Sequence, residues 1–383
     1  MTKKIVFIDS FYFDVIQKLT TSFLQESPKT YLEAIKRVEL FGFGTGSSYV
    51  GAFRRAGWDA HLIVPNFLEI QALWCKENGF RSPISKFWKL MQVFSRIPIV
   101  PICLEKLPYF YSVLLNQVKD ISPDVIIVQD LHCLHPHFVD ELKKIAPFVY
   151  GEIASPLPPE RFLKKYSRII SALPPIVQRS MEIGIPSSFL PLAYDTKFAA
   201  VKQFDKRSND VVFVGTFGRH QPKTIPLLQS IYEKNPGLRI YGNVDQAILE
   251  EAGLMKCFAG EAWGTEMFDV LSDSKIVINR HGTIAQNYSV NMRMYEATGS
   301  GAVLVTEDSV NISELFEPGQ EVCTYSDNDE AATKIQQLLA DSTKMELIAK
   351  QGRDRTLESH SYDQRVAELS KIIQADFDKR LIG

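Results

Sequence analysis

Residues 289–305 read Ser-Val-Asn-Met-Arg-Met-Tyr-Glu-Ala-Thr-Gly-Ser-Gly-Ala-Val-Leu-Val, and this stretch decides the predicted fold. Ser289 or Asn291 can cap the start of a helix, and the two glycines favour its end before a short apolar strand. Arg293 and Glu296 are three residues apart, so they share one face of that helix. The stretch therefore predicts a helix that leads directly into a buried strand.

The start of this helix is a candidate anion site. A helix start presents backbone N–H groups without partners in the helix and a partial positive charge, which suits a diphosphate. Arg293, one turn into the helix, can add a full positive charge. Glu296 offers hydrogen-bond acceptors only, so it suits the hydroxyls of a sugar or a ribose. The alternative is an ordinary amphipathic helix with an ion pair between these two residues on its exposed side.

The composition indicates a folded protein of two domains. The chain has 383 residues, of which 45% are hydrophobic, and this is enough for two cores of ordinary size. Its net charge of −2 argues against a nucleic-acid partner. The 5 cysteines show no Cys-x-x-Cys spacing, so we expect reduced thiols in the cytoplasm rather than zinc ligands or disulfides. We expect neither a signal peptide nor a membrane span, because no apolar run is long enough.

Short apolar runs alternate with helical segments along both halves of the chain. Such runs are typical of buried parallel strands. They lie at residues 4–9, 60–64, 123–129, 148–153, 168–171, 188–192, 210–214, 238–243, 274–279 and 302–305. A helical insertion is expected at residues 11–37. The alternation predicts two doubly wound, Rossmann-like α/β domains that face each other across a cleft.

Several candidate residues follow strands of the first domain, at the edge where open α/β sheets bind ligands. Asp130 and His132 come just past one strand, and His132 can bond sugar hydroxyls or act as a general base. The alternative is a loop histidine bonded to the backbone. Gly44 and Gly46 lie in a turn at a helix start that can approach a phosphate or a sugar ring, although a plain tight turn explains them equally. Glu152, at the end of another strand, is a further candidate for contact with a ligand.

Residues 67–111 interleave basic and aromatic side chains. Such a mixture can lie on a membrane surface or bind an acceptor, so peripheral membrane contact is one expectation. The alternative is a set of amphipathic helices that pack on the domain.

The second half repeats the plan with its own candidates. Gly215 follows one strand, Tyr241 and Gly242 end the next, and Asn279 and Arg280 stand at the carboxyl end of a third, where ligands of open α/β sheets bind. Residues 327–329 read Asp-Asn-Asp, which resembles a metal motif but precedes a helix, so we interpret it as a helix cap and expect no metal.

Residues 274–280, 289–305 and 312–316 resemble the donor-binding half of GT-B glycosyltransferases. Among these they look most like the bacterial spore-maturation (CgeB-like) branch, near the family-four retaining enzymes. Family four carries two glutamates separated by seven residues, and the second holds the nucleotide's ribose. Glu296 matches the second glutamate, whereas Tyr288 stands at the position of the first. The run from Arg293 to Glu296 fits the Arg-x-aromatic-Glu run of the spore-type branch.

The resemblance extends to three further segments. Arg219 and Lys223 are the nearest equivalents of two cations that hold the donor's pyrophosphate in family four. The run from Asp130 to His132 resembles the Asp-Trp-His of glycogen and starch synthases, whose histidine touches the donor sugar. Residues 192–198 resemble the hinge that closes the first domain. The resemblance thus implies an acceptor-side domain at residues 1–195, a nucleotide-sugar domain at 196–360 and a helix at 361–383 that crosses back.

The expected function is metal-independent glycosyl transfer from a nucleoside-diphosphate sugar, with retention of configuration, to a glycan, lipid-linked glycan or metabolite. We expect no cofactor, and the oligomeric state is left open. The runner-up is a sugar-nucleotide 2-epimerase, which shares the two-domain plan but needs carboxylates placed for proton transfer. A third alternative is an inactive GT-B protein that serves as a binding or scaffold subunit, because Tyr288 replaces the first glutamate.

Overall fold

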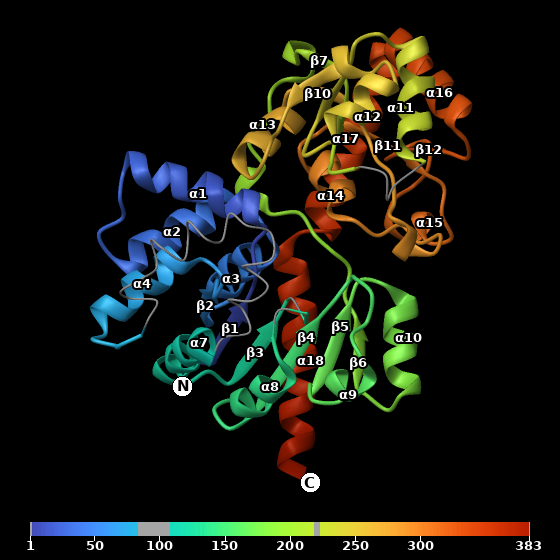
Figure 1. Ribbon diagram of the computed structural model, residues 1–383. Helices are drawn as coiled ribbons and strands as arrows, with labels where there is room; N and C mark the ends of the chain where they lie inside the picture. The colour runs from blue at the N-terminus through green and yellow to red at the C-terminus, as the bar shows by residue number, and fades with distance from the viewer. Residues whose placement is uncertain (1, 83–107, 130, 133, 218–222, 383) are drawn as a thin grey trace. The chain divides into compact units, whose positions relative to one another are not determined.

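The computed structural model describes residues 2–82, 108–129, 131–132, 134–217 and 223–382 (Figure 1). The chain divides into two compact units. Unit 1 comprises Met1–Leu190 and Val366–Gly383, and unit 2 comprises Pro191–Arg365.

Unit 1 is built on a six-stranded parallel sheet with the strand order β2-β1-β3-β4-β5-β6 among its described residues. Its strands are β1 (Lys4–Ile8), β2 (Asp59–Ile63), β3 (Val125–Val128), β4 (Phe148–Glu152), β5 (Arg168–Ser171) and β6 (Ser187–Phe189). The central strands are apolar along their length because helices cover both faces of a parallel sheet.

The helices of unit 1 include an insertion ahead of the first crossover. They are α1 (Phe13–Gln25), α2 (Tyr31–Phe41), α3 (Gly46–Arg55), α4 (Leu68–Glu77), α7 (Pro108–Ile121), α8 (Pro136–Lys143), α9 (Glu160–Leu163) and α10 (Pro174–Glu182), with α18 (Tyr362–Ile382) from the end of the chain. Helices α1 and α2 form the insertion that the sequence predicts at residues 11–37. Thr30 caps α2 by accepting a hydrogen bond of 3.1 Å from the Glu33 N–H.

Helix α18 packs on the strands of unit 1 (Figure 1). Its Asp376 carboxylate accepts hydrogen bonds from the Tyr150 hydroxyl at 2.6 Å and from the Arg168 guanidinium at 2.6 and 2.8 Å. The rings of Phe377 and Phe148 lie 4.9 Å apart at their centroids. These contacts hold the end of the chain against β4 and β5.

Unit 2 has a second six-stranded parallel sheet, with the order β12-β11-β10-β7-β8-β9 among its described residues. Its strands are β7 (Asn209–Val214), β8 (Leu238–Tyr241), β9 (Phe258–Gly260), β10 (Ser274–Ile278), β11 (Val303–Glu307) and β12 (Cys323–Tyr325). Its helices are α11 (Thr224–Lys234), α12 (Gln246–Glu251), α13 (Thr265–Ser272), α14 (Met292–Gly299), α15 (Ile312–Leu315), α16 (Asn328–Ala340) and α17 (Ser342–Ser359). The 3₁₀ turns are η1 (Thr196–Phe198), η2 (Phe204–Lys206), η3 (Met255–Cys257) and η4 (Thr283–Ala285).

Two apolar cores flank this second sheet. Along β7, Val211 and Phe213 belong to one core, whereas Val212 and Val214 belong to the other. Because side chains of a strand point alternately to opposite faces, a strand buried on both faces has a continuous apolar sequence. This is why an uninterrupted apolar run identifies such a strand.

The strand order places a topological switch point in each sheet. In unit 1, β1 pairs with β2 on one side and with β3 on the other. In unit 2, β7 pairs with β8 and β10 in the same way. Ligands of open α/β sheets bind outside the carboxyl ends of the strands at such points.

Two distant segments of unit 2 are joined by their backbones at Tyr194. The Tyr194 N–H donates to the His360 carbonyl at 2.7 Å, and the Tyr362 N–H donates to the Tyr194 carbonyl at 3.1 Å. The Arg365 Nε atom donates to the Pro191 carbonyl at 3.0 Å. Gly299, the last residue of α14, lies against the Tyr194 ring, because a Cβ at this glycine would come within 2.5 Å of that ring.

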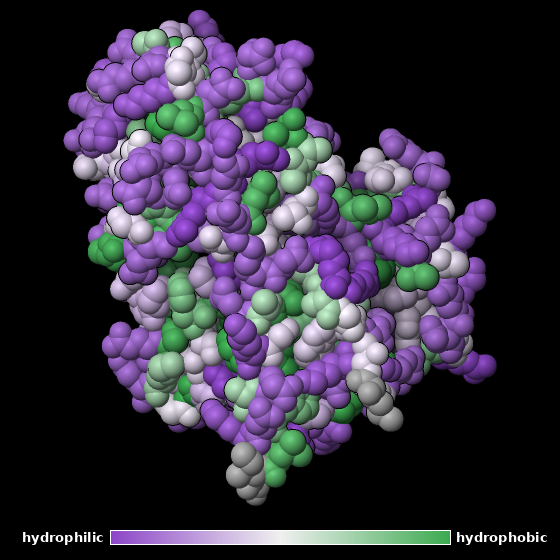
Figure 2. Space-filling model, turned by 180° about the vertical axis from the view of Figure 1, so that it is seen from behind, coloured by the Kyte–Doolittle hydropathy of each residue, from purple (hydrophilic) through white to green (hydrophobic). Residues whose placement is uncertain are grey.

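The prediction of two Rossmann-like α/β domains is confirmed by these two parallel sheets. The last strand of unit 1 ends earlier than predicted, at Phe189. Figure 2 shows hydrophilic residues over much of one face of the molecule, with apolar residues in separate patches. Within the described residues, no helix has the length and apolar character that crossing a membrane requires.

Candidate functional site

The predicted helix of the central stretch is α14, and Asn291 caps it. Asn291 has an extended backbone, and its Oδ1 atom accepts a hydrogen bond of 3.3 Å from the Met294 N–H. The amide group of the same side chain donates to Asn279 Oδ1 at 2.8 Å and to the Arg280 carbonyl at 3.1 Å. Since Asn279 directly follows β10, this cap fixes the start of α14 at the carboxyl end of that strand.

Ser289, the other candidate cap, has a different role. It is 1% exposed, and its hydroxyl lies 2.6 Å from the Ser309 hydroxyl and 3.3 Å from His281 Nε2. Its N–H donates to Asn311 Oδ1 at 2.7 Å. Ser289 therefore fastens the loop before α14 to the segment that follows β11.

Arg293 and Glu296 form an ion pair inside the protein. Arg293 Nη1 lies 2.8 Å from Glu296 Oε2, and their side chains are only 15% and 9% exposed. Arg293 Nε also donates to the carbonyl of Val214, the last residue of β7, at 3.1 Å. The ion pair between Arg293 and Glu296, which the sequence offered as the alternative to an anion site, thus exists. It is buried at the end of β7 rather than exposed. Surface ion pairs are common, whereas buried ones need good geometry to offset desolvation.

Burial raises the pKa of the Glu296 carboxyl, and the Arg293 charge opposes this shift. The two side chains satisfy one another in the absence of a ligand. A ligand that offers both an anion for Arg293 and hydroxyl donors for Glu296 can take over both roles. A ligand with only one of these groups leaves the other charge buried without its partner, which is costly.

A second charged network lies at the ends of β10 and β11. Glu307 Oε1 is 3.4 Å from Arg280 Nε, and Glu307 Oε2 accepts a hydrogen bond of 2.8 Å from the His281 N–H. Burial, with help from the Arg280 charge, lowers the pKa of His281 to about 4, so the ring is neutral at physiological pH. The His281 Nδ1 atom accepts a hydrogen bond of 3.4 Å from the Val290 N–H, just before the cap of α14.

Gly215 and Gly242 let two strand ends pass close together. A Cβ at Gly242 would lie 1.9 Å from the Gly215 carbonyl oxygen, and its φ of 139° favours glycine. The Gly215 N–H donates to the carbonyl of Tyr241 at 2.9 Å. The close approach of β7 and β8 explains the glycine at position 242, whatever ligand binds beyond it.

Of the two cations predicted to hold the pyrophosphate, the structure describes only Lys223. Lys223 is exposed and stands at the N-cap position of α11, where no side chain caps the helix. Arg219 lies outside the described residues.

At the switch point of unit 1, the predicted glycines pack around Asp9. The Gly46 N–H, at the start of α3, donates to Asp9 Oδ2 at 3.4 Å. A Cβ at Gly44 would lie 2.6 Å from the same oxygen, and Gly44 has a φ of 74°. The positive end of α3 therefore already faces a carboxylate.

Glu152 lies close to this position and is bonded to Gln129. Gln129 Nε2 donates to Glu152 Oε2 at 3.1 Å, and it also donates to the Thr45 hydroxyl. Burial raises the pKa of Glu152 to about 7, although the hydrogen bond from Gln129 opposes this shift. The structure thus adds Asp9 and Gln129 to the predicted group of Gly44, Gly46 and Glu152.

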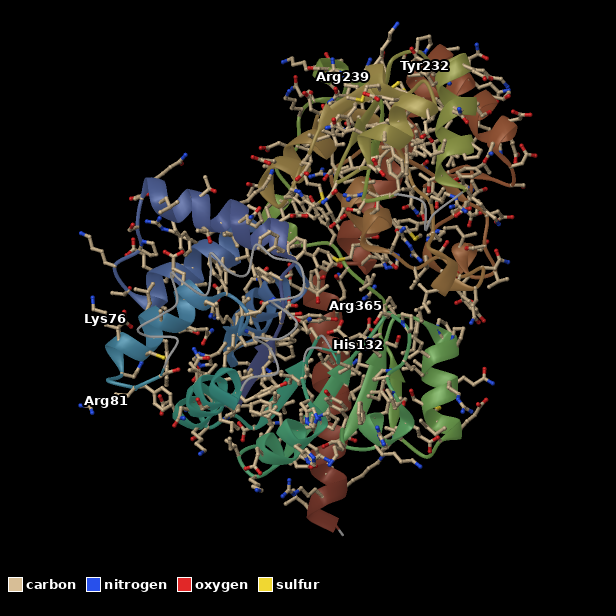
Figure 3. All side chains as sticks on the ribbon, in the orientation of Figure 1. Lys76, Arg81, His132, Tyr232, Arg239 and Arg365 are labelled. Carbon is tan, nitrogen blue, oxygen red and sulfur yellow. The ribbon has the colours of Figure 1, made fainter. Side chains whose placement is uncertain are left out.

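His132 is exposed in the loop after β3 (Figure 3). Its Nε2 atom lies 2.9 Å from the carbonyl oxygen of Pro156. This contact matches the backbone-bonded alternative of the sequence analysis, although an exposed ring can exchange it for a ligand hydroxyl. Asp130 lies outside the described residues.

The sequence analysis did not select Asp9, Gln129 or Glu307 as site residues. Each is a polar residue at or directly after the carboxyl end of an apolar strand. This position at the carboxyl end of a strand is the sequence signal that the three residues share with Glu152.

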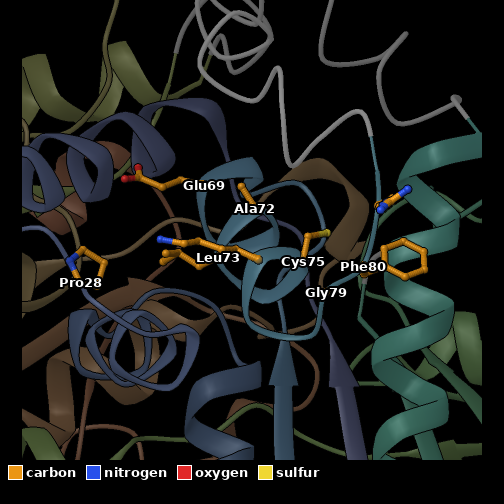
Figure 4. A pocket seen from close by; sticks show the side chains of 9 residues that line it. Pro28, Glu69, Ala72, Leu73, Cys75, Gly79 and Phe80 are labelled. Atoms are coloured by element: carbon orange, nitrogen blue, oxygen red, sulfur yellow. The ribbon is translucent and has the colours of Figure 1, made fainter.

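A surface pocket of about 490 Å³ lies elsewhere in unit 1, beside α4 (Figure 4). It is lined by Pro28, Glu69, Ala72, Leu73, Cys75, Lys76, Gly79, Phe80 and Arg81. Of the predicted site residues that the structure describes, none lines this pocket. It borders the start of the predicted basic and aromatic segment, of which residues 83–107 lie outside the described part.

The Asp-Asn-Asp run begins helix α16. Asp327 Oδ1 accepts a hydrogen bond of 2.8 Å from the Glu330 N–H, as the cap interpretation requires. Among the described residues, no group of three His, Cys, Asp or Glu side chains could hold a metal ion.

Comparisons with known proteins agree with this architecture. A family described as "Glycosyl transferase-like" matches residues 222–371, which is less than half of the chain. No curated protein sequence matches. A sucrose-phosphate synthase from Thermosynechococcus elongatus has a similar structure, with a TM-score of 0.61 and 13% identity over 98% of this chain and 100% of that chain.

Two further solved structures are similar over nearly their whole length. HepE from Anabaena, in complex with UDP and glucose, gives a TM-score of 0.60 and 12% identity over 97% of this chain and 100% of that chain. A glycosyltransferase from Rickettsia africae gives a TM-score of 0.56 and 9% identity over 98% of both chains. The chain therefore has the fold of the GT-B glycosyltransferases.

Proposed function

We propose that this protein transfers a sugar from a nucleoside-diphosphate sugar to a hydroxyl acceptor. The observation that carries this proposal is the capped start of α14 at the ends of β7 and β10, with the buried pair of Arg293 and Glu296 one turn in. The match of residues 222–371 to a glycosyl transferase-like family supports it.

Each element of this donor site has a proposed task. The start of α14 and Arg293 bind the diphosphate, and Glu296 binds the ribose hydroxyls. Further donor contacts come from Arg219, Lys223, Asn279, Arg280, Ser289 and Asn291, with Gly215, Tyr241 and Gly242 shaping the neighbouring strand ends. Asn291 and Ser289 act mainly by holding the helix start in place.

The chemical step follows from where charge develops. The bond between the anomeric carbon and the leaving oxygen breaks, a bond to the acceptor oxygen forms, and the acceptor's hydroxyl proton leaves with the diphosphate. Negative charge grows on the leaving diphosphate during this step. Fixed positive groups at that place stabilise the transition state more than the bound substrate.

Four finer features are proposed from the family resemblance: membership of the CgeB-like branch, a hexosyl donor, retention of configuration and metal independence. A cytoplasmic location is proposed from the cysteine pattern, and peripheral membrane contact from the basic and aromatic residues 67–111. Asp130 and His132 would orient the donor sugar, and Gly44, Gly46 and Glu152 would face the acceptor, which is a glycan, a lipid-linked glycan or a metabolite.

Incubation with a panel of nucleotide sugars, with and without candidate acceptors, tests the proposal. Release of free nucleoside diphosphate that is faster with an acceptor supports transfer. A changed sugar still attached to its nucleotide supports 2-epimerisation instead. Binding without turnover of any donor supports an inactive binding protein.

Calorimetry with nucleoside diphosphates tests the site itself. Arg293→Ala and Glu296→Ala should each weaken binding at least tenfold, which corresponds to about 1.4 kcal/mol. Arg239→Ala is the matched control, because Arg239 is an exposed cation on β8 of the same unit (Figure 3). Unchanged affinity in both site variants would remove the assignment of α14 as the donor site.

A further inference from the structure

Three neighbouring strands of unit 1 end in polar side chains. Asp9 follows β1, Gln129 follows β3 and Glu152 is the last residue of β4. The register pairs the end of β1 with the end of β3, and the end of β3 with the penultimate residue of β4. The three side chains therefore lie together where the carboxyl ends of these central strands meet, at the switch point of the sheet. We call this group of three residues the polar edge.

Gln129 connects the members of the polar edge. Its N–H donates to the carbonyl of Ile8 at 2.9 Å, while its side-chain Nε2 donates to Glu152 and to the Thr45 hydroxyl. The Gln129 Oε1 atom is buried and has no hydrogen-bond partner among the described residues. It packs against Gly46, where a Cβ would lie 2.5 Å away. A buried acceptor without a partner costs stability, so its presence calls for a structural or functional explanation.

Neutral groups donate the hydrogen bonds that the described residues show to Asp9 and Glu152 in the polar edge. The positive end of α3 is already turned toward Asp9. The carboxylate of Glu152 accepts a hydrogen bond from the neutral amide of Gln129, and burial raises the pKa of this carboxyl. A phosphate or carboxylate placed here would meet two acidic side chains.

The same groups suit hydroxyls. A carboxylate has about four lone-pair sites, so Glu152 can accept hydrogen bonds from a ligand while it keeps the bond from Gln129. Glycines at positions 44 and 46 bring the backbone close to this place.

We propose that the polar edge of Asp9, Gln129 and Glu152 binds an uncharged polyhydroxylated acceptor, a sugar or a polyol, through its hydroxyl groups. This rests on the proposed function for its meaning, since the ligand would be the acceptor of the transferred sugar. It narrows the acceptor to one whose reacting end carries no phosphate or carboxylate.

Ligand-observed NMR on the full chain tests this without any donor. The probes are glucose, glycerol and myo-inositol, with glucose 6-phosphate as the charged counterpart, at concentrations of about 50 mM because weak binding is expected. At least one uncharged probe should bind, and glucose 6-phosphate should bind at least tenfold more weakly than glucose. Glu152→Gln and Asp9→Asn should each weaken the uncharged probe at least tenfold.

Glu141→Gln is the matched control, because Glu141 is an exposed carboxylate on α8 of the same unit. Glu152→Asp, which keeps the charge, provides a second test if Glu152→Gln fails to fold. The proposal is overturned if no uncharged probe binds, if glucose 6-phosphate binds as tightly as glucose, or if both site variants bind like the control. Nucleotide calorimetry on unit 2 residues reports separately on the proposed function.

Discussion

The two switch points differ in how their acidic side chains are compensated. In unit 2, Glu296 is paired with Arg293 and Glu307 with Arg280, so each carboxylate has a cation beside it. In unit 1, Glu152 is bonded by the neutral amide of Gln129. A site of paired charges can exchange its internal partners for a ligand that is itself charged, whereas a carboxylate held by an amide suits neutral hydroxyls. The same strand topology thus surrounds its acidic side chains with different partners, and we expect the two ends to bind different ligands.

Removing one member of the buried pair in unit 2 should have the largest effect on stability. Arg293→Met leaves the Glu296 carboxylate buried without its cation, so the free energy of unfolding should fall by about 3–5 kcal/mol. Urea titration followed by circular dichroism measures this change. The double variant Arg293→Met/Glu296→Leu should regain most of the stability but no nucleotide binding. Recovery of binding in the double variant would contradict the proposed roles of the pair.

In unit 1, by contrast, we expect that replacing the acidic side chain of Glu152 increases the stability of the protein. The pKa of Glu152 is about 7 in the folded protein, above its ordinary value, so the folded state binds more protons between the two pKa values. The stability tied to this proton is complete below the unfolded pKa and is lost as pH rises through about 7. Glu152→Gln should therefore stabilise the protein at pH 8 by about 1–3 kcal/mol.

Thermal unfolding of the wild type and Glu152→Gln at pH 8 and pH 5 measures this effect. The gain should shrink at pH 5, where the wild-type carboxyl is protonated. A variant that is less stable than the wild type at pH 8 would show that the carboxylate is better compensated than the structure indicates.

His281 gives unit 2 the reverse pH dependence. Its pKa is about 4 in the folded protein, below its ordinary value, so the unfolded state binds more protons between these values. Its contribution is complete above the unfolded pKa and is lost as pH falls toward about 4. We expect His281→Gln to cost about 1–2 kcal/mol at pH 7, through the lost hydrogen bonds, and less at pH 5. Urea titrations at both pH values measure the difference, and an equal cost at both would contradict the titration.

Lys223 should give the smallest effect. It is exposed, so its attraction to a diphosphate is weakened by water and salt. Lys223→Ala should lower nucleotide affinity about threefold at low salt, which is about 0.6 kcal/mol, and hardly at all in 0.5 M salt. Calorimetry at two salt concentrations measures both values. A loss as large as that of Arg293→Ala would mean that Lys223 binds the ligand within a closed site.

The sequence predicted the fold because each unit repeats a local pattern. Apolar runs mark strands buried on both faces, and the residues after them mark the ligand edge, as with Asn279 and Glu152. The strands β9 (Phe-Ala-Gly) and β12 (Cys-Thr-Tyr) were not predicted, because neither sequence contains a recognisable apolar run.

Other features depend on partners that are distant in the sequence. Ser289 and Asn291 are equally good caps by residue type, and the contacts of Ser289 with Ser309 and Asn311 decide between them. In the same way, the spacing of Arg293 and Glu296 predicts one shared face, but only the sheet beneath determines that this face is buried.

The backbone pairing at Tyr194 has a consequence for dissecting the protein. The first and last segments of unit 2 are hydrogen-bonded to each other, and the Tyr194 ring packs against Gly299 at the end of α14. A fragment that starts after Tyr194 and stops before Ser361 would lack both backbone hydrogen bonds of Tyr194. The last turn of α14 would then lose its contact with the Tyr194 ring, so an isolated second half should be prepared from Pro191 to Arg365 if its ligand affinity is to represent that of the whole chain.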